Sequence, residues 1–230
     1  MECRVVRGCA AVVLAGALAA FGCSGGSHPP AAPESATAEP AAGDVAGWLA
    51  VLRGQDVYAQ QRAAAALGRI GAPAVPGLAE ALKEPRVEVR DRAVVALSAM
   101  GSDAIPTLAL ALHDSQRSVR ERATAALLQY GAAALPSFEA ALEYDHHAVR
   151  EDAAQALSHF GAPAVPPLER ALADPDWRVR DKALKALGAI GKPAVPALEA
   201  ASLKPDRAMR AEATRLLEDI GSRGAGAPAS

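Results

Sequence analysis

The stretch VRDKALKALGAIGKPAVPAL, residues 179–198, decides the fold of this chain. Val179, Ala183 and Leu187 recur at the spacing of one helix face and predict an amphipathic helix. Gly191 then ends this helix, because glycine adopts the left-handed conformation of a helix C-terminus without steric cost. The first half of the stretch therefore predicts one helix with a defined end.

A second helix is predicted from about Pro193. Pro193 and Pro196 both fit the first turn, where backbone N–H groups have no partner inside the helix. Val195, Leu198 and Leu203 are expected to form its apolar side. The whole stretch therefore predicts a helical hairpin.

The same pattern returns every 30 residues without an insertion. Its columns are glycine at 71, 101, 131, 161, 191 and 221, proline at 76, 106, 136, 166 and 196, arginine at 90, 120, 150, 180 and 210, and leucine at 67, 97, 127, 157, 187 and 217. A single hairpin cannot bury both of its apolar faces, whereas stacked hairpins bury them against one another. The composition agrees, since alanine is abundant and aromatic residues make up only 3%. An all-α solenoid of stacked hairpins follows.

The repeat unit resembles HEAT repeats, in the short 30-residue form known from phycobilisome lyases. This resemblance implies a right-handed α-solenoid, a superhelix of the HEAT and armadillo type with a curved surface. The expected divisions are an N-terminal capping helix at 44–55, repeats at 56–85, 86–115, 116–145, 146–175 and 176–205, a C-terminal helix at 206–221 and a disordered tail at 222–230. The resemblance further implies a protein that binds other proteins.

The N-terminus has the pattern of an export signal. Arg4 and Arg7 precede an apolar run at residues 10–21, which is long enough for a signal peptide and too short to span a membrane. The following Gly22-Cys23-Ser24 resembles a bacterial lipobox. The resemblance implies a signal peptide at 1–22 and a lipid on Cys23, followed by a disordered linker through residue 43.

The expected location is therefore the cell envelope. Ser24 after the cysteine resembles the sorting pattern of outer-membrane lipoproteins, so we expect a lipid anchor in the outer membrane that faces the periplasm. The alternative is an ordinary cleaved leader with an incidental cysteine, which would make the protein secreted.

The arginine column allows two interpretations. It could form a ladder that binds anions, or each arginine could reach the loop carbonyls or the acidic group of an adjacent repeat and so fix the stacking angle. We favour the structural interpretation, because binding at one point would not require an arginine in every unit.

Positions that vary between repeats are better candidates for function. A partner-binding patch is predicted where the scarce aromatic residues gather among histidines and arginines, and its members are Arg117, Tyr144, His146, His147, Trp177 and Arg207. Aromatic and arginine side chains are enriched at protein interfaces, and an arginine over Trp177 could add a cation–π contact. The alternative is that Trp177 lies flat over the seam between repeats while the histidines are solvated.

The second helices carry another candidate, an acidic column formed by Glu139, Glu169 and Glu199. It could bind a basic partner, although solubility of an alanine-rich surface is the simpler explanation.

Nothing in the sequence favours catalysis. His146 and His147 are neighbours without a third ligand at metal spacing, and no cofactor is expected. The alternative is an enzyme related to deoxyhypusine hydroxylase or to bilin lyases. The first uses His-Glu pairs that this chain lacks, and the second acts in the cytosol. The net charge of -2 does not favour nucleic acid. We expect a monomeric protein-binding scaffold without a small-molecule substrate, attached to a membrane only by its lipid.

Overall fold

The computed structural model describes residues 39–225 of the chain. The predicted signal peptide, Cys23 and the linker as far as residue 38 lie outside the described residues, as do residues 226–230.

Twelve α-helices follow one another in this described part, and it contains no strand. They are α1 Val45–Leu52, α2 Val57–Ile70, α3 Val75–Ala81, α4 Val87–Ser98, α5 Ile105–Ala111, α6 Arg117–Leu128, α7 Leu135–Ala141, α8 His147–Leu157, α9 Val165–Ala171, α10 Trp177–Ile190, α11 Val195–Ser202 and α12 Arg207–Ala225. Each even-numbered helix from α2 to α10 forms a hairpin with the odd-numbered helix that follows it. The prediction of an all-α solenoid is confirmed.

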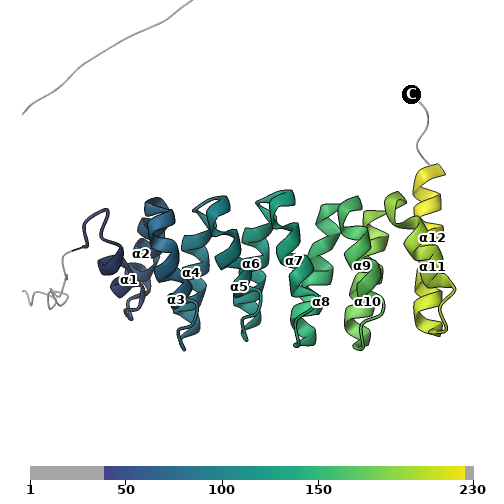
Figure 1. The fold of residues 1–230 in the computed structure, drawn as a ribbon, viewed down its shortest axis with the longest axis horizontal. Helices are drawn as coiled ribbons and strands as arrows, with labels where there is room; N and C mark the ends of the chain where they lie inside the picture. The colour runs from purple at the N-terminus through teal and green to yellow at the C-terminus, as the bar shows by residue number, and fades with distance from the viewer. Residues whose placement is uncertain (1–38, 226–230) are drawn as a thin grey trace, which may run out of the picture. The chain divides into compact units, whose positions relative to one another are not determined.

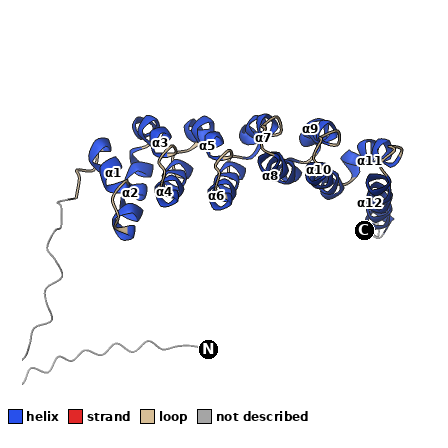
Figure 2. Cartoon of the chain, turned by 90° about the horizontal axis from the view of Figure 1, so that it is seen from below, coloured by secondary structure: helices blue, strands red, loops and turns tan. Residues whose placement is uncertain are grey.

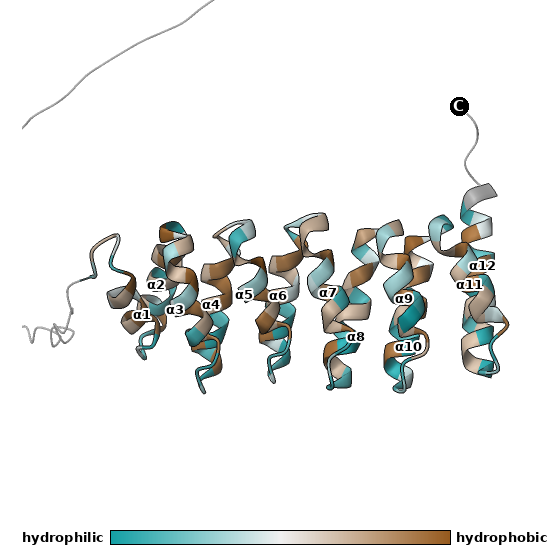
Figure 3. Cartoon of the chain, in the orientation of Figure 1, coloured by the Kyte–Doolittle hydropathy of each residue, from teal (hydrophilic) through white to brown (hydrophobic). Residues whose placement is uncertain are grey.

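The hairpins formed by helices α2 to α11 stand side by side in chain order (Figure 1). The even-numbered first helices form one row and the odd-numbered second helices form the other (Figure 2). The loops that precede the first helices, such as 173–176 and 203–206, lie along one edge. This loop edge is the lower one in Figure 1 and is mainly hydrophilic in Figure 3.

The core is one continuous apolar layer between the two rows of helices. The repeated leucine of the first helix has no exposed surface in five successive repeats, at Leu67, Leu97, Leu127, Leu157 and Leu187. The second helices supply Leu78, Leu108, Phe138, Leu168 and Leu198, which are equally buried. Burial of one such side chain stabilises the fold by about 1.5–3 kcal/mol. Each repeat therefore depends on its neighbours for most of its stability.

The glycine column makes the turn inside each hairpin. Gly71, Gly101, Gly131, Gly161 and Gly191 all have positive φ values. A short 3-10 turn follows each of them, such as Lys192–Ala194 after Gly191, and the second helix begins only then. The second helix thus starts at Val195, two residues later than the predicted Pro193, while Pro196 lies in its first turn as expected.

Two expectations about the C-terminal part were wrong. Leu203 was expected on the apolar side of its helix, but it is 85% exposed. In earlier repeats the buried leucine of this turn lies one position earlier, as at Leu172. The residue at that position in this repeat is Ser202. Gly221 does not end α12, which continues to Ala225. Glycine permits a turn but does not impose one.

None of the helices in the described residues combines the length and hydrophobicity that crossing a membrane requires.

Candidate functional site

The arginines of the repeated column form hydrogen bonds with the loops along the loop edge. The Nη1 atom of Arg90 donates to the carbonyl oxygens of Glu84 and Pro85, and its Nε and Nη2 atoms donate to Asp114, in the loop before α6, at 2.6 and 2.9 Å. This hydrogen-bonded carboxylate raises the pKa of Arg90, although burial opposes the shift. Arg150 makes the same bidentate contact with Asp174.

Arg120 departs from this pattern. The position that corresponds to Asp114 and Asp174 is Tyr144, which cannot accept a bidentate pair. Arg120 keeps its bonds to loop carbonyls but donates through Nε to Asp152 of α8 at 2.7 Å. All five arginines of the column therefore bond loop carbonyls, as the structural interpretation predicted, whereas the acidic partner is Asp152 for Arg120 and Asp206 for Arg180.

The predicted patch lies along the loop edge. Arg117, His147, Trp177 and Arg207 are the first residues of α6, α8, α10 and α12, so neighbouring repeats present them one after another. Tyr144 and His146 belong to the loop before α8. The structure thus brings the six residues to one edge, spread over four repeats, rather than into one cluster.

Trp177 is 60% exposed and does not lie flat over the seam as the alternative required. The guanidinium that stacks on its ring is that of Arg178, 5.2 Å from the ring centroid. Neither Arg117 nor Arg207 makes this contact. Arg117 instead donates to Glu121 of its own helix at 2.7 Å, which raises the pKa of Arg117.

The aromatic residues near α8 make contacts with other residues of the repeat domain. Tyr144 is 43% exposed and stacks on His113, a contact that the sequence analysis missed. The Nδ1 atom of His146 accepts a hydrogen bond from the amide of Ala148 and so caps α8. His147 stacks on His146 and lies 3.9 Å from a carboxylate oxygen of Asp176.

The described residues contain no group of three or more histidine, cysteine, aspartate or glutamate side chains placed to hold a metal ion.

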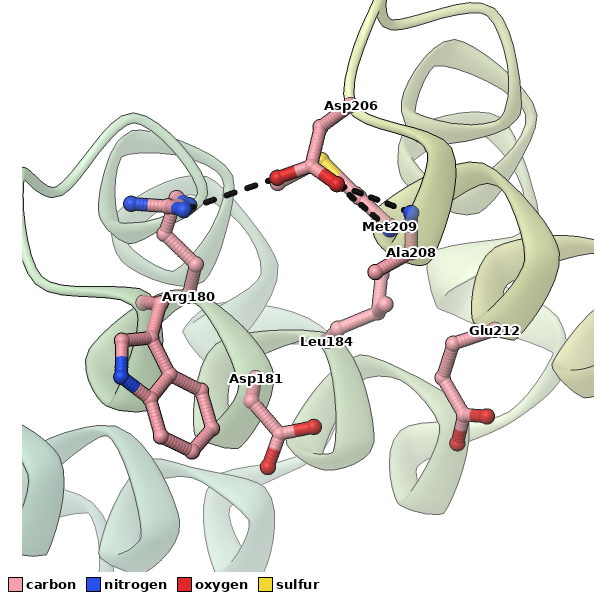
Figure 4. Close-up of a pocket in the computed structure, with 8 residues that line it drawn as sticks. Arg180, Asp181, Leu184, Asp206, Ala208, Met209 and Glu212 are labelled. Carbon is pink, nitrogen blue, oxygen red and sulfur yellow. Dashed lines mark hydrogen bonds and ion pairs between the residues drawn. The ribbon is translucent and has the colours of Figure 1, made fainter.

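A groove of about 180 Å³ lies beside Trp177, between α10 and α12. Its lining consists of Trp177, Arg180, Asp181 and Leu184 from α10 and Asp206, Ala208, Met209 and Glu212 from the next repeat. Figure 4 shows Asp181 and Glu212 on opposite helices, with Leu184 between them. Sequence reasoning missed this groove, although Asp181 belongs to an acidic column with Asp91, Glu121 and Glu151 that could have indicated one of its walls.

Asp206 stays ionised at the end of this groove. It accepts hydrogen bonds from the amides of Met209 and Ala208 at the start of α12, and these bonds lower the pKa of Asp206, the bond from Met209 most (Figure 4). Arg180 approaches the same carboxylate at 3.5 Å and donates to the carbonyls of Asp174 and Pro175. The charge of Arg180 is therefore directed toward the loop.

Stacked hairpins that share one apolar seam define the class of α-solenoid repeat proteins. The family model for HEAT repeats matches residues 45–128 and 135–218, and the chain belongs to this family.

Comparison with solved structures supports the same fold. The N-terminal domain of MAST/Orbit is 18% identical, with 76% of this chain and 97% of that one covered at a TM-score of 0.58. A crescerin TOG domain structure is 16% identical, with 75% and 88% covered at a TM-score of 0.57. Human deoxyhypusine hydroxylase is 21% identical over 77% of this chain and 84% of that chain, at a TM-score of 0.45. No curated protein matches the sequence significantly.

Proposed function

We propose that this protein is a non-catalytic interaction scaffold that presents its loop edge to another protein. The observation that carries the proposal is the exposure of Trp177, because a rigid aromatic side chain that the core does not need is typical of interface anchors. Tyr144, Arg117 and Arg207 extend the same exposed edge into neighbouring repeats. Repeat stacking makes this surface long, which suits a protein partner better than a small molecule.

The acidic column on the second helices is a weaker candidate for the interface. Glu169 and Glu199 are exposed and Glu139 is partly exposed, but the column contains no aromatic anchor. We assign it to solubility.

We infer further that the protein is exported and held at the cell envelope by a lipid on Cys23, in the outer membrane facing the periplasm. The support is the order of features in the sequence, with arginines first, then an apolar run at 10–21 and then the lipobox-like cysteine. The unbroken 30-residue period supports repeats of the phycobilisome-lyase type. The absence of His-Glu pairs supports a non-catalytic protein rather than an oxidoreductase of the deoxyhypusine hydroxylase type. We propose a monomer without a cofactor.

In-cell crosslinking tests the interaction. A photoreactive amino acid is placed at position 177 and, as a matched control, at position 110, which is 54% exposed on a second helix. A discrete crosslinked species from 177 and none from 110 is expected. Equal labelling from both positions would contradict a binding edge.

Metabolic labelling with a fatty-acid analogue tests the anchor. The wild-type chain is expected to be labelled and to fractionate with membranes, whereas the Cys23→Ala variant is unlabelled. An unlabelled wild-type chain would leave the scaffold proposal intact but refute the lipid.

A further inference from the structure

Acidic and basic side chains face each other across two of the seams between first helices. Arg122 of α6 pairs with Asp91 of α4. Two repeats later, Lys182 of α10 approaches Glu151 of α8 at 3.8 Å. Side chains of opposite charge therefore connect α4 with α6 and α8 with α10.

The α6–α8 and α10–α12 seams instead have acidic side chains on both helices. The residue in the place of Arg122 and Lys182 is Asp152 in α8 and Glu212 in α12. Asp152 lines one groove with Glu121, and Glu212 lines another with Asp181. Like charges repel, and both seams hold open grooves, of about 250 Å³ between α6 and α8 and about 180 Å³ between α10 and α12.

The chain neutralises the α6–α8 groove with its own arginines. Arg117 donates to Glu121 at 2.7 Å, and Arg120 donates to Asp152 at 2.7 Å. Each carboxylate of this groove therefore has a guanidinium from α6. The α6–α8 groove therefore shows how carboxylates at these repeat positions bind arginine side chains.

The α10–α12 groove lacks both of these guanidinium groups. Trp177 stands in the place of Arg117, and Arg180, in the place of Arg120, turns to Asp206 and the loop carbonyls. Within the described residues, the ion-pair partners of Asp181 and Glu212 are Lys185 and Arg215 of their own helices.

Those remaining pairs lie within one helix each and do not cross the groove. The partner of Asp181 is Lys185 at 2.7 Å, whose side chain is 55% exposed, and Glu212 accepts two hydrogen bonds from Arg215, whose side chain is 61% exposed. Each carboxylate oxygen can accept more than one hydrogen bond. An added cation between the two helices can therefore share these carboxylates with their present partners.

The rest of the lining suits a long cationic side chain. Leu184, Ala208 and Met209 offer apolar surface for an aliphatic stem. Trp177 lines the same groove with the guanidinium of Arg178 over one face of its ring, so a second cation can approach only the other face. Two carboxylates from opposite helices can then accept the N–H groups of one guanidinium.

We infer that the α10–α12 groove binds an arginine side chain of the partner protein, between Asp181 and Glu212 and against Trp177. This inference rests on the proposed function and names the chemistry of its partner. The bound arginine replaces the guanidinium groups that the chain itself supplies in the α6–α8 groove.

Nuclear magnetic resonance of the indole N–H groups tests this inference on the full chain. The probe is a blocked Gly-Arg-Gly peptide, and the same peptide with citrulline, which is neutral and nearly isosteric, is the control. The chain has two tryptophans, and Trp48 is a reference because it is buried and its indole N–H donates to the carbonyl of Ala41. The arginine peptide is expected to shift the Trp177 signal in a saturable way, and the citrulline peptide is not.

Charge-neutral variants identify the groove. The double variant Asp181→Asn, Glu212→Gln should bind the arginine peptide about tenfold more weakly, a difference of about 1.4 kcal/mol. The matched control Glu121→Gln changes the equivalent acid in the α6–α8 groove and should leave binding unchanged. Thermal melting verifies that both proteins remain folded.

Three outcomes would overturn the inference: no shift of the Trp177 signal, an equal shift with citrulline, or full binding by the double variant. These results are separable from failure of the proposed function. If the double variant still forms the crosslink from position 177 in cells, the loop edge binds a partner that does not use arginine here.

Discussion

The ring of Tyr144 stacks on the ring of His113, with the centroids 3.8 Å apart and the planes inclined by 11°. Tyr144 occupies the position that corresponds to Asp114 and Asp174, which bind Arg90 and Arg150. The seam before α8 therefore has an aromatic pair in place of the usual ion pair. Arg120 adapts by bonding Asp152 instead.

The ion pair between Arg90 and Asp114 is nearly buried, with side chains 10% and 6% exposed. We predict that Asp114→Ala lowers the free energy of unfolding by about 3–5 kcal/mol, because it leaves a buried guanidinium without its carboxylate. Urea denaturation measures this change. Asp91→Ala is the matched control, since it breaks the more exposed pair with Arg122 and should cost about 1 kcal/mol or less. Equal losses would contradict a structural role for the ladder.

Burial lowers the pKa of His113 from its ordinary value of 6.5, so the folded state favours the neutral ring. The unfolded state then takes up a proton at a higher pH than the folded state does, and stability is lost as the pH falls below 6.5. We predict that His113→Phe, which keeps a ring against Tyr144 but cannot titrate, reduces the fall in melting temperature between about pH 7.5 and about pH 5.5. An identical fall in both proteins would exclude His113 as its source.

Gly191 has φ 80° and ψ -134°, a conformation that side chains other than glycine rarely adopt. A Cβ atom there meets no other atom within 4 Å, so the cost of Gly191→Ala is conformational, and we predict about 1–3 kcal/mol of destabilisation. Gly221→Ala is the control. Gly221 lies inside α12, where alanine is the better helix former, so this variant should gain up to about 1 kcal/mol. Chemical denaturation of the two variants should therefore give changes of opposite sign.

Trp177 and Phe138 are large aromatic residues in opposite environments, since the first is 60% exposed and the second is fully buried. We predict that Trp177→Ala leaves the melting temperature nearly unchanged, whereas Phe138→Ala costs about 3–5 kcal/mol. Helicity by circular dichroism should stay constant in the Trp177 variant. A fall of many degrees in its melting temperature would show that Trp177 belongs to the core.

The sequence predicted the hairpin, its period and the residues of its core, because these depend on local rules. Helical spacing identified Leu187, and Gly191 marked the turn, since both signals act within a few residues. The same rules failed where a column shifted by one residue, as at Leu203, and at Gly221, where the helix continues to Ala225 because glycine permits a turn without imposing one.

The candidate site could be predicted only in part. Variation within a strict repeat identified Trp177, because the scaffold does not dictate a residue at that position. The expected arginine over its ring is present as Arg178, although the repeat pattern alone did not indicate which arginine would make the contact.

The sequence by itself determined where each helix face lies and which residues return at every thirtieth position. Only the tertiary structure decided which of these residues meet across a seam. Stacking brings Asp181 near Glu212 and leaves Arg180 facing Asp206, and such pairings depend on the offset between neighbouring helices. Contacts between repeats depend on side-chain direction as well as on spacing, so the repeat pattern alone could not distinguish an ion-paired seam from an open groove.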